Sequence, residues 1–256
     1  MKMDSKERFT DRVDDYRKYR PNYPEELIGV IKEICKLNDH SIVADIGSGT
    51  GIMTEIVLPH CRTVFAVEPN ANMRIAAEQQ YISNPKFVSV NGSAEETTLP
   101  SNSIDLIISA QAFHWFDRSL SKREFQRVLK REGWVVLVWN TRVIDGDAFH
   151  IELEEFLRRE TPEYGKIHHK NIDIKTLAEF FSQKLIMFKE LPNQQILDWD
   201  GMKGRFLSAS YIPAPGQPNH EFIVDGLKKI FLKHQSDGTV TLKYVTEMYA
   251  SRFGST

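Results

Sequence analysis

The strongest indication of the fold is the stretch Ser41-Ile42-Val43-Ala44-Asp45-Ile46-Gly47-Ser48-Gly49-Thr50-Gly51. Its apolar part, residues 42–46, is typical of a strand buried on both faces of a parallel sheet. The glycines that follow tolerate positive φ and let a ligand approach the backbone closely. A helical pattern begins at Ile52 and runs to Leu58. The order strand, glycine turn, helix therefore predicts a ligand site at the turn.

The spacing of the glycines narrows the class of ligand. A phosphate loop requires Gly-Lys-Ser/Thr, and no such lysine follows Gly47. A dinucleotide fingerprint would place a glycine at position 52, which is Ile52 in this chain. The carboxylate of Asp45, inside the strand, would repel a phosphate but suits a cationic ligand or loop amides.

A second acidic residue lies at the end of the next predicted strand, residues 63–67. Glu68 follows that strand about twenty residues beyond the loop, where an acid can accept hydrogen bonds from ribose hydroxyls. The expected ligand therefore carries a ribose and no pyrophosphate.

The two segments VADIGSGTG and VFAVEPN together resemble motifs I and II of the class I S-adenosylmethionine (SAM)-dependent methyltransferases. A glycine-rich loop alone is weak evidence, because purely structural turns also use glycine, whereas the pair is specific. The resemblance implies SAM as the cofactor, with contacts from Asp45, Gly47, Gly49, Gly51 and Glu68.

Helices and strands alternate through the first 140 residues, which favours a parallel sheet covered by helices on both faces. With the resemblance, the predicted fold is α/β, a doubly wound, mostly parallel seven-stranded sheet of the Rossmann-like methyltransferase type with a helical cap. Residues 1–140 are expected to form an N-terminal strap and the SAM-binding core. Residues 141–185 are expected to form the helical cap, and residues 186–256 the C-terminal part of the same core sheet.

The N-terminal segment FTDRVDDYRKYRPNYP, residues 9–24, has two interpretations. It could be a solvated helix that docks one apolar edge. It also resembles the strap of a bacterial and fungal methyltransferase subgroup that includes the trans-aconitate methyltransferase-like enzymes, in which the strap covers the cleft. That resemblance implies cofactor or substrate contacts from Tyr16 and Arg20, and a substrate contact from Tyr23.

Two further segments are placed at the adenine by the resemblance. Met73 lies on a predicted helix where the family packs an apolar residue against adenine, although a methionine there is also ordinary core. Ser93, Ala94 and Glu95 follow the third predicted strand and could match the adenine edge through a backbone N–H and an acceptor. The alternative is an ordinary turn with a capping serine.

The segment after the fourth predicted strand, AQAFHWF, lies at the reacting end, because ligands of α/β sheets bind beyond the carboxyl ends of the strands. Its sequence resembles that of the small-molecule methyltransferase subgroup named above. The Asp/Asn-Pro-Pro-Tyr motif of amino-methylating enzymes is missing there. Ala110 and Gln111 are assigned to the cofactor, and His114 and Trp115 to the substrate. His114 could act as a general base, or it could only shape the pocket wall.

Composition limits the partners. Of the 256 residues, Lys and Arg number 33 and Asp and Glu 35, so there is no basic surplus of the kind that nucleic-acid binders carry. No apolar run approaches the roughly 20 residues that span a bilayer. The two cysteines and the lack of a signal peptide favour a reducing cytoplasm. His168 and His169 suggest a solvated loop rather than a metal site, and the oligomeric state stays open.

The predicted function is in-line methyl transfer from SAM to a small-molecule acceptor through an oxygen, nitrogen or carbon atom. A base is needed only if the acceptor arrives protonated. Two alternatives remain: a SAM-binding protein without catalysis, and a nicotinamide-dependent oxidoreductase, which Ile52 disfavours.

Overall fold

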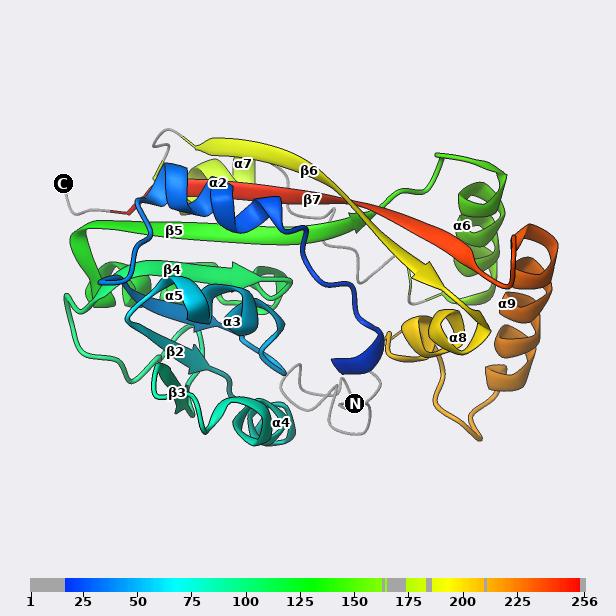
Figure 1. The fold of residues 1–256 in the computed structure, drawn as a ribbon, viewed down its shortest axis with the longest axis horizontal. Coiled ribbons are helices and arrows are strands. Elements are labelled where there is room, and N and C mark those ends of the chain that lie inside the picture. The colour runs from blue at the N-terminus through cyan, green and yellow to red at the C-terminus, as the bar shows by residue number, and fades with distance from the viewer. Residues whose placement is uncertain (1–16, 163, 165–173, 183–185, 210, 254–256) are drawn as a thin grey trace.

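A seven-stranded sheet lies at the centre of the protein (Figure 1). The computed structural model describes residues 17–162, 164, 174–182, 186–209 and 211–253. The strand order is β3-β2-β1-β4-β5-β7-β6, with parallel pairing from β3 to β5 and with β7 antiparallel to both of its neighbours. The predicted mostly parallel seven-stranded sheet is confirmed. The strands are β1 (Ile42–Ile46), β2 (Thr63–Val67), β3 (Phe87–Val90), β4 (Ile104–Ala110), β5 (Leu129–Arg142), β6 (Met187–Leu197) and β7 (Val240–Arg252).

Helices cover both faces of the sheet, because alternate strand residues point to opposite sides. Val43 packs in a cluster with side chains of α2 (Glu26–Cys35), α3 (Ile52–Val57) and α4 (Ala71–Tyr81). Ala44, the next residue, packs in a second cluster with α5 (Arg118–Val128) and α7 (Ile174–Phe180). The doubly wound arrangement is therefore confirmed.

The chain reverses its direction of winding between β1 and β4. Strand β1 pairs with β2 on one side and with β4 on the other, so that Asp45 lies opposite Ala66 and Ile108. A crevice forms at such a switch point, beyond the carboxyl ends of the strands. The glycine turn after β1 opens onto this crevice.

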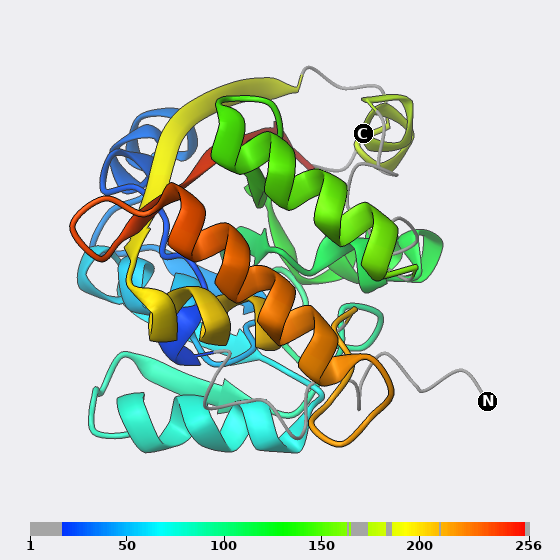
Figure 2. The ribbon, with the colours of Figure 1, turned by 90° about the vertical axis from the view of Figure 1, so that its right-hand side faces the viewer.

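Three helices gather beyond one end of the sheet, at the right of Figure 1, and form what we call the cap. They are α6 (Ala148–Glu160), α8 (Trp199–Leu207) and α9 (His220–His234). Their apolar side chains form a third cluster with the outer ends of β6 and β7, from Phe149 and Leu153 to Leu242 and Tyr244. Figure 2 shows α6 and α9 side by side, in agreement with their contacts.

This grouping corrects the predicted division of the helices, in which residues 141–185 alone formed the cap. Helix α7 belongs to the core instead: Phe180 packs edge-on against Phe113 at 4.6 Å and against Phe125 at 5.9 Å between ring centroids. Helices α8 and α9, which were assigned with the core sheet, join α6. Helices α6 and α7, which both lie within residues 141–185, thus bury their apolar faces against different partners.

Strand β6 reaches from the core sheet to the cap. It continues through Pro192 to Leu197 and pairs with β7 over its whole length, as far as Val240. Proline is tolerated there because β6 is an edge strand and its missing N–H removes no ladder bond. The extension carries the chain from the core sheet to the cap.

Candidate functional site

A cavity of about 290 Å³ lies at the switch point and extends from the glycine turn to the cap. The strap residues 17–24, the carboxyl ends of the parallel strands and the cap all contribute to its wall. Its lining includes most of the residues predicted from the sequence: Arg20, Tyr23, Asp45, Gly47, Gly49, Glu68, Met73, Ser93, Ala94, Glu95, Ala110, Gln111, His114 and Trp115. Tyr16 lies outside the described residues, and Gly51 is not part of this lining.

The three glycines of the turn have positive φ, at 71°, 56° and 90°, but they serve different purposes. A Cβ on Gly47 would lie 2.5 Å from the Cβ of Ala112, and one on Gly51 would lie 2.6 Å from the ring of Tyr81. Both positions are therefore glycine because of packing. A Cβ on Gly49 would meet only the sulfur of Met73 at 3.7 Å, so this α-carbon borders the open cavity.

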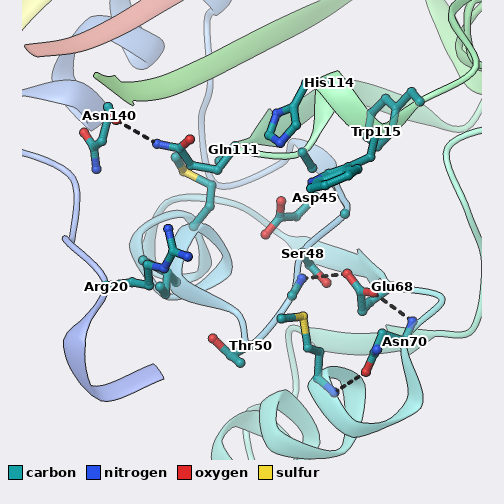
Figure 3. A pocket seen from close by; sticks show the side chains of 18 of the residues that line it. Arg20, Asp45, Ser48, Thr50, Glu68, Asn70, Gln111, His114, Trp115 and Asn140 are labelled. Atoms are coloured by element: carbon teal, nitrogen blue, oxygen red, sulfur yellow. Dashed lines mark hydrogen bonds between the residues drawn. The ribbon is translucent and has the colours of Figure 1, made fainter. Parts of the chain in front are cut away.

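Glu68 ties the glycine turn to the next wall of the cavity (Figure 3). Its Oε2 accepts a hydrogen bond from the Gly49 N–H at 2.9 Å, and its Oε1 accepts one from the Asn70 N–H at 2.8 Å. Burial raises the pKa of Glu68, although these amide bonds oppose the shift. Each carboxylate oxygen has a second lone pair, so hydroxyl groups of a ribose can still donate to this side chain.

Asp45 is the most deeply buried acid of the cavity wall, with 1% of its surface exposed. Thr54 Oγ1 donates to its Oδ2 at 2.7 Å, while Oδ1 has no hydrogen-bond partner among the described residues. Burial raises the pKa of Asp45 to about 7, and the charge of Glu68 adds to the effect. A cationic ligand would stabilise the ionised form, which is what a sulfonium and an ammonium group supply.

The hydroxyls of Ser48 and Thr50 add to this donor and acceptor set. Both oxygens are buried in the cavity lining and have no partner among the described residues. Buried polar atoms are rarely left unpaired. Together with Asp45 Oδ1 and the open α-carbon of Gly49, they fit a polar, cationic ligand such as SAM.

The predicted adenine segment lies on the same side as Glu68. Asn70 caps α4 by accepting from the Met73 N–H at 3.0 Å, which places the Met73 side chain, 6% exposed, in the cavity wall. Glu95 Oε1 accepts from the backbone N–H of Asp117 at 2.8 Å. The second oxygen of Glu95 stays available to an exocyclic amine, as the resemblance implies.

His114 lies in the 3₁₀ turn η3 (Phe113–Trp115), after β4. Its ring centroid is 4.8 Å from that of Trp115, and its Nδ1 is buried without a partner among the described residues. Burial, aided by the charge of Arg20, lowers the pKa of His114 to about 4. The imidazole is therefore neutral at neutral pH and a weak base.

The strap is held by hydrogen bonds to segments far away in the sequence. The carbonyl oxygen of Asn22 accepts from Asn140 Nδ2 at 3.2 Å and from Asn193 Nδ2 at 2.7 Å. Arg20 Nη2 donates to the Ser208 carbonyl at 3.1 Å. The Gln111 side chain, whose residue has a φ of 58°, donates to the Asn140 carbonyl at 3.3 Å. One network thus joins the strap, the end of β4 and the end of β5.

Sequence reasoning missed the wall that faces the strap, which comes from the end of β5 and from the cap. Arg142 is buried there and its Nη2 donates to Glu154 Oε2 and, at 2.7 Å, to Tyr164 Oη. An isolated arginine carries no sequence signal of a binding site. The missed lining residues of this wall are Asn140, Arg142, Tyr164, Arg205, Ala209 and Tyr211.

Two negative findings apply to the described part of the chain. Within the described ranges, His, Cys, Asp and Glu side chains form no group of three or more that could hold a metal ion. None of the helices in those ranges is both long and apolar enough to cross a membrane.

A doubly wound sheet with a glycine turn after its first strand and an acid after its second is the arrangement that the sequence resemblance predicts. Comparison with known proteins agrees: residues 44–137 match the methyltransferase domain family. The matched segment contains the glycine turn and Glu68, so the part of the chain that resembles this family is the part that forms the cofactor side of the cavity.

Individual relatives extend the comparison. An uncharacterized methyltransferase-like protein of Schizosaccharomyces pombe is 36% identical over 138 residues, which cover 52% of each chain. The chain thus spans about half the length of that relative. A second uncharacterized methyltransferase of the same yeast is 24% identical over 95% of this chain and 96% of its own. A solved structure from Anaeromyxobacter dehalogenans, provisionally described as a type II methyltransferase, shares the fold with a TM-score of 0.69, at 20% identity over 93% of this chain and 100% of its own.

Proposed function

We propose that this protein transfers the methyl group of SAM to a small-molecule acceptor. The observation that carries the proposal is the continuity of the cavity, whose lining runs from Gly49 and Glu68 to Tyr164 and Arg205. A cofactor bound at Gly49 and Glu68 would point its methyl group toward Tyr164 and Arg205. SAM supplies an already activated methyl group, so the main task of the protein is alignment of the two reactants.

The residues of the chain have distinct tasks in this proposal. Glu68 would hold the ribose, Asp45 would balance positive charge, and Met73 would cover the adenine. The strap would exclude water through its bonds at Asn22. Holding reacting atoms near 3 to 3.5 Å contributes several kcal/mol to catalysis of a displacement reaction.

The acceptor class is the finer part of the proposal. A cavity of about 290 Å³, with strap residues in its lining, suits a small molecule better than a polymer. Three arginines in the lining, Arg20, Arg142 and Arg205, suit a carboxylate acceptor of the kind used by the trans-aconitate methyltransferase-like enzymes. Such an acceptor needs no base, which is consistent with the low pKa of His114.

Binding and turnover test the proposal together. Native mass spectrometry of the purified protein should detect SAM or its demethylated product, and SAM but not NADH should raise the melting temperature. Formation of S-adenosylhomocysteine with a small-molecule acceptor then separates an enzyme from a SAM-binding protein without catalysis. A shift by NADH alone would favour the oxidoreductase alternative.

A further inference from the structure

We propose that Arg142 is the residue that binds an oxyanion of the acceptor, and that the cap sets the direction of its guanidinium group through Glu154. This inference rests on the proposed function, because it concerns the acceptor end of the same cavity. It assigns the recognition to a residue after the matched methyltransferase segment, which ends at residue 137.

The two terminal nitrogens of the Arg142 guanidinium group differ in their hydrogen bonds. Its side chain is 10% exposed, and Nη2 donates to both Glu154 and Tyr164. Nη1 is buried and has no hydrogen-bond partner among the described residues. A buried charged donor without an acceptor is costly. Because Arg142 lines the cavity, an acceptor atom of a bound ligand can supply the missing bond.

The charges around the cavity favour an anion at this end. The acids of the lining, Asp45, Glu68 and Glu95, belong to the cofactor half: Asp45 lies in β1, Glu68 directly after β2, and Glu95 in the loop after β3. The lining residues from the end of β5 and from the cap include the cations Arg142 and Arg205. Nη1 of Arg142 still has N–H groups to donate, and a charged donor bonds most strongly to an anionic oxygen such as that of a carboxylate.

Glu154 orients Arg142 from the cap. This carboxylate, on α6, also accepts from Tyr164 Oη at 2.7 Å and from Arg158 Nε at 2.6 Å. These donors lower the pKa of Glu154 against the effect of burial. The Glu154 carboxylate therefore stays ionised and holds Nη2 of Arg142 in place, so the guanidinium group has little freedom to rotate. Arg142 is then a binding residue and Glu154 a positioning residue.

The test uses the full chain saturated with S-adenosylhomocysteine and measures binding by calorimetry. The probes are succinate and citrate, each compared with its neutral amide, so that only the charge and the oxyanion differ. The wild type should bind at least one acid and not the matching amide. Arg142→Met should weaken that binding about 10- to 100-fold. Arg142→Lys, which keeps the charge but lacks the planar guanidinium group that Glu154 orients, should weaken it by less. Equal binding of acids and amides, or no effect of Arg142→Met, would overturn the inference.

Two further variants separate recognition from folding. Glu154→Gln should weaken binding of the acid while leaving the affinity for S-adenosylhomocysteine and the cooperative melting unchanged. Arg159→Met removes a neighbouring arginine of α6 that pairs with Glu160 instead of Glu154; Arg159 is 68% exposed and outside the cavity lining, so acid binding should stay within twofold. Retained cofactor affinity with no acid binding refutes only this inference, whereas lost affinity for SAM and its product in the wild type refutes the proposed function.

Discussion

The side chain of Glu68 accepts a hydrogen bond from the backbone of Gly49, nineteen residues earlier, at 2.9 Å. The same carboxylate accepts from the backbone of Asn70. A residue predicted only as a ribose acceptor therefore also holds the glycine turn in place. We therefore expect substitutions of Glu68 to change both the ligand affinity and the stability of the turn.

Replacing Glu68 by Ala should weaken SAM binding by about 1.5 to 3 kcal/mol, the range for losing hydrogen bonds to a charged group. It should also lower the free energy of unfolding by about 1 to 3 kcal/mol, because two buried amides lose their acceptor. Calorimetry and urea unfolding measure the two effects. Glu96→Ala, at an exposed position outside the cavity lining, is the control. Unchanged SAM affinity would contradict the ribose assignment.

Replacing Gly49 by Val should abolish SAM binding while unfolding remains cooperative. The protein has room for a Cβ at this position, so the added side chain would enter the cavity instead of the core. The left-handed φ of 56° adds a strain of about 1 to 2 kcal/mol. Gly238→Val imposes a similar strain, at a φ of 78°, in open space outside the cavity lining. If both variants bind SAM equally well, the turn does not touch the ligand.

Asp45 should make the protein less stable as the pH rises from about 4 to about 7. Burial raises the pKa of Asp45 to about 7, so in this window the folded state holds a proton that the unfolded state has lost, and stability falls with pH. Asp45→Asn should remove up to about 4 kcal/mol of this dependence. Urea unfolding at pH 5 and pH 8 measures it. A constant difference between the two proteins across this range would exclude the shift.

Replacing His114 by Gln should mainly raise the KM for the acceptor. A general base would instead predict a kcat lowered by 10²-fold or more and the loss of an acidic limb from the pH profile. Because burial lowers the pKa of His114 to about 4, we expect the wild-type profile to show no acidic limb above about pH 5. Steady-state kinetics from pH 5 to pH 9 distinguish the two roles. A limb near pH 6.5 that the substitution removes would establish the base.

Replacing Gly204 by Ala should release the strap. Alanine normally stabilises a helix by about 1 kcal/mol relative to glycine, but a Cβ on Gly204 of α8 would lie 2.2 Å from the ring of Tyr19. Hydrogen exchange of residues 17–24 should become faster, and addition of SAM should slow it less than in the wild type. Gly29→Ala, in α2 with no atom within 4 Å of the new Cβ, should only stabilise. Unchanged hydrogen exchange would mean that the Tyr19 ring moves aside while the strap stays bound to α8.

The cofactor half of the site could be predicted because its signals are local. A buried strand, a turn that needs positive φ and an acid at the end of the next strand lie within 27 residues, from Ile42 to Glu68. Parallel strands then bring these residues together without further information. Gly51 shows the limit of this reasoning, since its role is to make room for Tyr81 rather than to line the cavity.

The acceptor half could not be predicted because it depends on contacts between distant segments. The cap joins α6 to α8 and α9, which lie on the other side of β6 in the sequence. An apolar helical face in the sequence shows that the helix packs against another element, but not against which one. The residues of α6 and α7 were therefore grouped only because they are adjacent in the sequence. Arg142 and Arg205 become site residues only once β5, β6 and β7 extend past the core.

Strand β5 passes through both halves of the protein. Its first part, up to Val138, lies in the common core, and its last residues, including Asn140 and Arg142, touch the strap and the cap. The boundary between the segment that matches the methyltransferase domain family, which ends at residue 137, and the wall formed with the cap therefore falls within one continuous strand. If the segment after residue 140 is exchanged with that of a relative, we expect the acceptor preference to change and cofactor binding to be kept, provided that the register of β5 against β7 is preserved.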